Sequence, residues 1–310
     1  MTEAFYWFLN MQIVASLCAI IILALRKFTH LPRRLICWLW LIPALRALIP
    51  WGIGNRWGSF GLVGLISRVW GREAVVSGVP DALFSNYVQI AEAYNPLTFA
   101  SSWQEKLFAT CGLVWIIGAA ALLLTFIILY ATTLRELKDA RPLAGQAGIY
   151  ASEKVSGPAL YGLIRPRILL PAGTEGEPAL PYILLHERTH LSRRDNLRRM
   201  LAFFLAALCW FNPLGWLCLK RFLEDLELAC DEQVLQSLGE EKKKDYARAL
   251  VTQAEQKYVF VSAFGGAAVR LRVEKILSWR RISLLAWLAL GAFALALAWF
   301  LLVNPLGGVR

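Results

Sequence analysis

The chain has 310 residues, 57% of them hydrophobic, and its mean hydropathy is positive. Ordinary soluble domains are about 45–50% apolar, so this excess argues against a wholly soluble protein and favours membrane-spanning segments. A net charge of +11 is typical either of nucleic-acid-binding proteins or of membrane proteins with basic cytosolic loops. The sequence has no basic recognition helix, so we expect no direct contact with nucleic acid. The six cysteines form no CxxC pair, which argues against a zinc knuckle or a disulfide framework.

Four apolar stretches are long enough to cross a bilayer, which takes about 20 helical residues. They run from Phe5 to Leu25, from Leu35 to Ile53, from Leu107 to Tyr130 and from Leu284 to Val303. No cationic region precedes the first stretch, so we expect an anchor and not a cleaved signal peptide. Arg46 interrupts the second stretch, where it should either pair with a neighbouring span or reach the outer interface.

Basic residues orient these spans in the membrane. The short connection 26–34 carries four Lys and Arg residues, and segment 131–281 carries 23 of the 33 in the chain. The positive-inside rule places both segments in the cytosol. The N-terminus, the loop 54–106 and the tail after the fourth span are then expected outside.

Segment 131–281 contains a further apolar run, MLAFFLAALCWFNPLGWLCL, at residues 200–219. Arginine or lysine flanks both of its ends, and Pro213 breaks its centre, so we expect a non-spanning hairpin packed against the bilayer. The Gly- and Pro-rich stretch 148–173 predicts two or three short strands. Helical periodicity covers 178–199 and returns from 220 to about 258.

Residues 184–195 read LLHERTHLSRRD and contain an HExxH motif. His186 and His190 are four residues apart and therefore share one face of a helix, where both can bind the same metal ion. Glu187 lies between them and can take a proton from water at the metal. The surrounding arginines place this site at the cytosolic face and not within the hydrocarbon.

A third ligand is expected from the acidic stretch RFLEDLELACDEQVL, because catalytic zinc usually takes three protein ligands. We assign Glu227, with Glu224 as the alternative. Asp231 is four residues after Glu227 and is expected to hold a ligand histidine in its tautomer. If 200–219 crossed the membrane, Glu227 would emerge on the side opposite to the histidines. A shared ion therefore requires that this run does not cross.

Four motifs in this order, GLIRPRILLP, HERTHLSRRD, CWFNPLGW and EDLELACDEQVL, resemble the BlaR/MecR family of antirepressor membrane metallopeptidases. The resemblance implies one zinc ion per chain at His186, His190 and Glu227, with Glu187 as general base and Asp231 in support. It also implies a bacterial plasma-membrane protein that cleaves a BlaI/MecI-type repressor, often together with itself. β-Lactam-sensing members carry an extracellular penicillin-binding domain after the last span. This sequence ends at NPLGGVR, so we expect no such sensor.

The expected fold is a mainly α membrane protein with four transmembrane helices. Residues 1–130 form the membrane domain, 131–281 a cytosolic α+β zincin-like (gluzincin-type) metallopeptidase domain, and 282–310 the fourth helix with its tail. Two other functions stay open: a general quality-control metalloprotease, and a non-proteolytic sensor or scaffold that keeps zinc for structure. The sequence is compatible with a homo-oligomer and does not identify the signal. Tyr246 is a candidate oxyanion donor that the sequence alone does not select.

Overall fold

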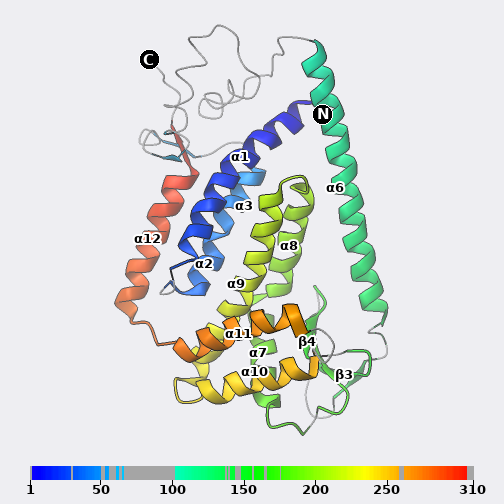
Figure 1. Ribbon diagram of the computed structural model, residues 1–310, viewed down its shortest axis with the longest axis vertical. Helices are drawn as coiled ribbons and strands as arrows, with labels where there is room; N and C mark the ends of the chain where they lie inside the picture. Colours follow the sequence, from blue (N-terminus) through cyan, green and yellow to red (C-terminus); the bar gives the residue numbers. More distant parts are fainter. Residues whose placement is uncertain are drawn as a thin grey trace.

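The structure is a computed structural model, shown in Figure 1. It describes residues 2–28, 31–49, 53–55, 61–62, 65, 102–136, 138, 140–143, 148–155, 157–163, 166–174, 176–257 and 262–305. Long helices run roughly along one direction, and a smaller region of helices and strands lies at one end of them. Most of the expected extracellular loop 54–106 lies outside the described residues.

Two described helices are long and apolar enough to cross a membrane, by length and composition alone. One is Glu105–Arg135 within α6 (Ser102–Glu136), and the other is α12 (Leu284–Leu302). The first expected span corresponds to α1 (Thr2–Leu25), in which the apolar stretch Met11–Leu25 is shorter. The number of spans therefore rests on the sequence for the N-terminal helices.

The second expected span is broken into α2 (Arg33–Leu39) and α3 (Leu41–Leu48). Pro43 has no N–H to donate to the preceding turn, which accounts for the break near Trp40. From Arg33 to Leu48 a helical chain is about 24 Å long, less than the roughly 30 Å of a hydrocarbon core. The helix also ends five residues before the expected boundary at Ile53.

After α3 the chain forms strand β1 (Ile53–Asn55), which pairs in parallel with β6 (Val303–Pro305) beyond α12. The first core cluster lies where α1, α2, α3 and α12 meet; its least exposed members include Cys18, Ile22, Ile36 and Leu301. Arg46 is only 2% exposed, and its Nε donates to the carbonyl oxygen of Leu301 at 2.9 Å. Of the two expected arrangements for Arg46, the structure has the pairing with a neighbouring helix.

Residues 200–219 lie in the hairpin of α8 (Asp195–Leu208) and α9 (Pro213–Leu238). Asn212 caps α9 through its side-chain oxygen, which accepts from the N–H of Leu214 at 3.0 Å, and Pro213 occupies the first turn. The turn lies between the long helices, beside α1 and α6 (Figure 1). The hairpin therefore brings the far half of α9 back to the end of the molecule where α8 begins.

The smaller region contains a four-stranded sheet in the order β2-β3-β5-β4. The strands are β2 (Arg141–Pro142), β3 (Ile149–Ser152), β4 (Ala159–Tyr161) and β5 (Arg167–Pro171). β3 and β5 are parallel, and the outer pairs are antiparallel. The stretch 148–173 thus forms three strands, as expected, and its apolar residues pack against α7 (Leu180–Arg193) through Leu184.

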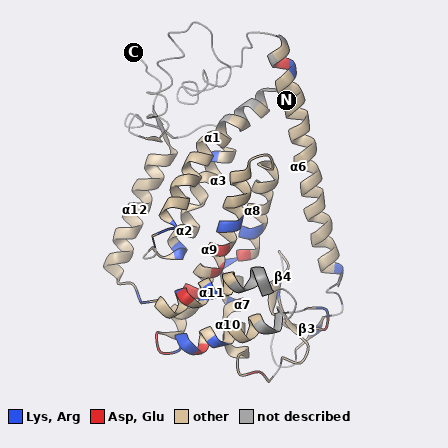
Figure 2. Ribbon diagram, viewed as in Figure 1, with Lys and Arg blue, Asp and Glu red and all other residues tan. Residues whose placement is uncertain are grey.

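Two further helices complete this region, α10 (Lys243–Lys257) and α11 (Ser262–Ser278). They enclose a core with α9, in which Val234, Tyr246 and Ile276 are almost fully buried. Figure 2 shows that charged residues gather on this region, whereas most of α1, α6 and α12 carry none. The distribution of charge and the core clusters therefore both separate the long apolar helices from the smaller region of helices and strands.

Candidate metal centre

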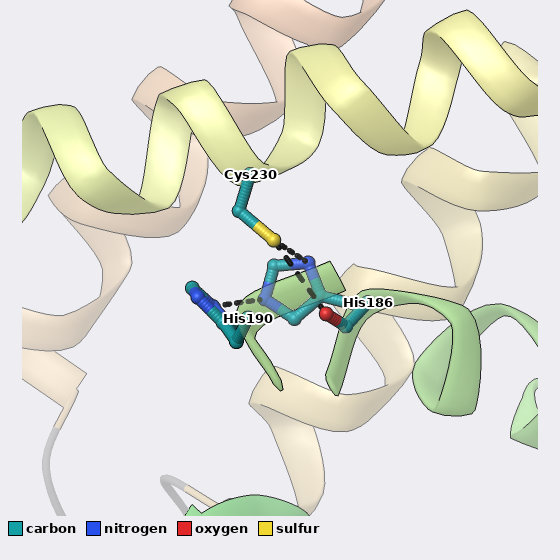
Figure 3. Close-up of side chains that lie close together, drawn as sticks. All are labelled: His186, His190 and Cys230. Atoms are coloured by element: carbon teal, nitrogen blue, oxygen red, sulfur yellow. Dashed lines mark hydrogen bonds between the residues drawn. The ribbon is translucent and has the colours of Figure 1, made fainter. Parts of the chain in front are cut away.

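Helix α7 presents the two histidines of the HExxH motif to the same side. His186 is 4% exposed and His190 is 3% exposed. Their Nε2 atoms lie 3.1 Å apart, and their rings are nearly perpendicular. Figure 3 shows both rings directed toward α9 from the helix below. The spacing of four residues thus places two nitrogen donors side by side, as expected from the motif.

Glu227 of α9 lies opposite these two nitrogens. Its Oε2 is 3.6 Å from His186 Nε2, and its Oε1 is 3.6 Å from His190 Nε2. Zinc–nitrogen and zinc–oxygen bonds of about 2.0–2.2 Å in a tetrahedron separate the ligand atoms by about 3.3–3.5 Å. The observed separations bracket this value, so the three side chains fit a tetrahedral ion with small adjustments.

The Nδ1 atom of His190 is bound to Asp195, which is fully buried. His190 Nδ1 and Asp195 Oδ2 are 2.7 Å apart. Arg194, between α7 and α8, has a left-handed φ of 55°, and this turn places Asp195 next to the preceding helix. Because a carboxylate oxygen accepts, His190 donates through Nδ1, which directs its Nε2 toward His186 and Glu227. Asp195 also pairs with Arg193 and Arg198, so this carboxylate orients His190 and joins two ion pairs at the same time.

Tyr246 of α10 fixes the other histidine. Its hydroxyl donates to Asp231 Oδ1 at 2.6 Å and lies 2.9 Å from His186 Nδ1, from which it can accept. His186 Nε2 then faces His190 and Glu227, and the Arg272 Nη2 also lies 3.3 Å from it, a contact that a metal ion at this nitrogen would displace. Asp231 lies 3.4 Å from His186 Nδ1, so its expected link to the histidine runs mainly through Tyr246. Tyr246 contacts the ring at Nδ1, away from Nε2, which argues against an oxyanion role.

Cys230 is a further donor atom near the histidines. It forms a group with His186 and His190 in which the ligand atoms lie within 4.8 Å of one another. Its Sγ is 3.6 Å from His186 Nδ1 and 3.5 Å from the His186 carbonyl oxygen (Figure 3). Two ligand sets are therefore geometrically available, one through Nε2 with Glu227 and one through Nδ1 with Cys230. The contact of Tyr246 with Nδ1 favours the first.

Two arginines from other helices contact the same carboxylates. Arg272 of α11 donates to both oxygens of Asp231 at 2.8 Å and lies 3.4 Å from Glu227, and Arg199 of α8 also pairs with Glu227. Burial acts to raise the pKa of Glu227, but hydrogen bonds with His186 and His190 and the charge of Arg272 outweigh it and hold this pKa well below its ordinary value.

Burial also acts to raise the pKa of Asp231, and the Arg272 guanidinium lowers it by more. Both carboxylates are therefore ionised, as a metal ligand or a hydrogen-bond acceptor requires.

The remaining sequence candidates are Glu187 and Glu224. Glu187 is 5% exposed and lies on α7 between the two histidines in sequence. Glu224, the alternative third ligand, instead pairs with Arg26 and Arg221. The structure thus brings Glu227 to the histidines and directs Glu224 to other partners.

The protein-family model described as BlaR1 peptidase M56 matches residues 6–285. The chain belongs to this family. The regulatory protein BlaR1 of Bacillus licheniformis is 32% identical over 102 residues, which cover 32% of this chain and 17% of that protein. The methicillin resistance mecR1 protein of Staphylococcus aureus strain Mu50 is 27% identical over 103 residues, covering 32% of this chain and 18% of that protein. The aligned part spans less than a fifth of these relatives.

Proposed function

We propose that the chain is an integral-membrane zinc metallopeptidase that hydrolyses peptide bonds on the cytosolic side. The observation that carries the proposal is the pair of Nε2 atoms of His186 and His190, 3.1 Å apart, with one Glu227 oxygen 3.6 Å from each. The Nδ1 atoms of both histidines are engaged by Tyr246 and Asp195, which directs the Nε2 atoms toward a shared ion; Arg272 Nη2, 3.3 Å from His186 Nε2, would give way to it. Membership of a peptidase family supports the same reaction class.

Each side chain of the site has its own role in the proposed peptide hydrolysis. A zinc ion held by His186, His190 and Glu227 would supply Lewis acidity for activating water and polarising the peptide carbonyl. Glu187 is the general base, which takes the proton of the attacking water and passes it to the leaving amine. Asp195 orients His190, while Asp231, through Tyr246, orients His186.

We place the metal centre in the cytosol, with 26–34 and 131–281 inside and the N-terminus outside. Four spans, at about 5–25, 35–53, 107–130 and 284–303, give this arrangement with the hairpin of α8 and α9 not crossing. The hairpin's return toward α7 supports this topology, because Glu227 and the histidines must reach one ion from the same side. The apolar character of α6 and α12 also supports it.

The substrate we propose is a cytosolic repressor of the BlaI/MecI type, with cleavage of the chain itself as a second reaction. Support comes from the relatives, which are named as a regulatory protein and a methicillin-resistance protein. A membrane-anchored peptidase that removes a repressor would connect an event at the membrane to transcription. Among the described residues, no specific contact favours a further candidate function.

The test replaces Glu187 by Gln, which keeps the size of the side chain and removes its basicity. We expect Glu187→Gln to retain about one zinc per chain, measured by elemental analysis of the purified protein. Cleavage of a co-expressed BlaI-type repressor should fall by at least about 100-fold, since general base catalysis contributes roughly 10²–10⁴. Glu224→Gln is the matched control, because this glutamate pairs with Arg26 and Arg221 outside the site.

Each result has a definite meaning. A Glu187→Gln variant that cleaves as fast as the wild type would exclude Glu187 as the base. A wild type without zinc would contradict the metal centre. A wild type that contains zinc and loses none of its cleavage on chelation would contradict the zinc-dependent mechanism.

A further inference from the structure

A cavity of about 410 Å³ has neither histidine among its lining residues, although Asp231, which lies 3.4 Å from His186 Nδ1, borders it. We call it the basic cavity. Its walls come from the start of α2, the second half of α9, the end of α11 and the connection to α12. The residues used below are Arg33, Arg34, Lys275, Trp279, Arg280, Arg281 and Trp287. Its volume lies within the range of small-molecule sites in proteins, which is about 300–1,000 Å³.

Cations outnumber acids around this cavity. Five Lys and Arg residues line it, against the two acids Asp231 and Glu232. Both acids already have partners: Asp231 binds Arg272, and Glu232 accepts from the backbone N–H groups of Arg33 and Arg34 at 2.8 and 3.1 Å. The carboxylates therefore leave a net positive lining.

Two of these cationic groups have unused donors that solvent can reach. Arg33 is not one of them, because it is 7% exposed, pairs with Asp225 at 3.3 Å and has a buried Nε. The side chains of Arg280 and Arg281 are exposed and form no hydrogen bond or ion pair within the described part of the chain. The cavity therefore presents positively charged side chains whose N–H groups can bind an anion.

The position of the cavity indicates where the anion comes from. It lies at the start of α12, whose N-cap Ser283 is followed by the apolar run from Leu284 to Leu302. Trp279 and Trp287 line the cavity on either side of this start, and the Arg34 guanidinium lies 5.8 Å from the centre of the Trp287 ring. Tryptophan and arginine together at the end of an apolar helix are typical of a membrane–water interface. Figure 2 shows basic residues near the same ends of α2 and α12.

We propose that the basic cavity binds the phosphate group of an anionic phospholipid from the cytosolic leaflet. Arg280 and Arg281 supply the charge and the hydrogen-bond donors, and the two indoles border the glycerol region. Basic pockets between transmembrane helices on the cytosolic side are known to hold anionic headgroups. Asp231 borders both this cavity and the metal centre, but Arg280 and Arg281 belong to the connection before α12 and are not part of the metal centre.

The experiment measures lipid binding to the full chain by native mass spectrometry. The protein is first purified and delipidated in a non-ionic detergent. Dioleoyl phosphatidylglycerol, dioleoyl phosphatidylcholine and soluble glycerol 3-phosphate are titrated separately. We expect saturable binding of phosphatidylglycerol that is weakened roughly 10- to 30-fold in the Arg280→Gln/Arg281→Gln double variant. The Lys242→Gln/Lys244→Gln double variant loses the same charge at the exposed start of α10 and should bind as the wild type does.

The outcomes separate the alternatives. Equal binding of phosphatidylcholine, or unchanged binding in the Arg280→Gln/Arg281→Gln variant, would overturn the proposal. Saturation by glycerol 3-phosphate at the same two arginines, with no preference for the lipid, would keep the phosphate site and overturn the bilayer as its source. If the double variant does not fold, the single variants Arg280→Gln and Arg281→Gln supply the test, each with a smaller expected loss.

Discussion

Glu227 and Cys230 are three residues apart on α9 and approach the His186 ring at different nitrogens. Glu227 faces Nε2 at 3.6 Å, while Cys230 Sγ is 3.6 Å from Nδ1. One ring nitrogen binds one metal, and the Nδ1 proton is already directed to Tyr246. The residues around the ring therefore favour Glu227 as the third ligand, and this choice can be tested by zinc content.

We predict that Glu227→Gln lowers zinc affinity by at least about 100-fold, because it removes a charged ligand from a three-ligand site. Cys230→Ser should keep nearly wild-type affinity, since the thiol is not needed for the Nε2 set. Competition with a chromogenic chelator measures both. Strong zinc loss in Cys230→Ser together with retention in Glu227→Gln would reverse the assignment.

The hydroxyl of Tyr246 is expected to orient His186, and this role can be measured. Tyr246→Phe leaves the buried ring in place and removes the hydrogen bonds to His186 and Asp231. We predict a 10- to 100-fold loss of zinc affinity, the usual effect of removing a group that orients a metal-binding histidine. Tyr182→Phe is the control, because Tyr182 packs near Tyr246 without bonding to the histidine. Equal affinity in the two variants would show that Asp231 alone orients the ring.

The sequence predicted some of these residues and not others, for a physical reason. His186 and His190 are found by helical spacing, and Glu227 by the need for a third ligand in an acidic helix. Tyr246 and Arg272 reach the site from α10 and α11, and their position depends on how three helices pack. No local pattern marks such a contact. Asp195 is close to the histidines in sequence, but its hydrogen bond to His190 depends on the left-handed turn at Arg194, which the sequence pattern does not predict.

At the scale of elements, the hairpin of α8 and α9 is fixed by contacts that hydropathy does not reveal. The sequence indicated a break at Pro213, and the structure has its turn there. The partners of the turn were not foreseeable. Trp115 of α6 donates to the carbonyl oxygen of Leu208 at 2.7 Å, and Asn212 donates to Ser16 of α1 at 3.1 Å. These bonds satisfy backbone and amide groups that would otherwise be costly in apolar surroundings.

Gly118 of α6 gives a test of this packing. A Cβ atom at this position would lie 2.6 Å from the Trp210 ring, so alanine forces the hairpin and α6 apart. We predict that Gly118→Ala destabilises the protein by about 1–3 kcal/mol, which appears as a lower midpoint of thermal unfolding in detergent. Gly291→Ala on α12 is the matched control, since no heavy atom lies within 4 Å of its added Cβ. An equal midpoint in both variants would contradict the close contact of α6 with the hairpin.

At the scale of the whole molecule, the metal centre and the topology depend on each other. The sequence predicted spans at the positions of α6 and α12, the two described helices that are long and apolar enough to cross a membrane. It placed the end of the second span at Ile53, where the structure has a strand after a helix broken near Pro43. The end of a helix near a proline depends on local backbone hydrogen bonds, which a hydropathy average over many residues does not register. The predicted orientation depends less on such local detail, because the positive-inside rule sums the Lys and Arg residues of whole segments.

The last prediction tests this topology with single cysteines in a chain whose six native cysteines are replaced by serine or alanine. Glu105 begins the apolar stretch of α6, and Glu241 lies in the exposed turn between α9 and α10. A membrane-impermeant maleimide should label Glu105→Cys in intact cells and Glu241→Cys only after lysis. If the hairpin crossed the membrane, Glu241→Cys would also be labelled in intact cells. Glu227 and the histidines would then lie on opposite sides, and the proposed zinc centre could not form.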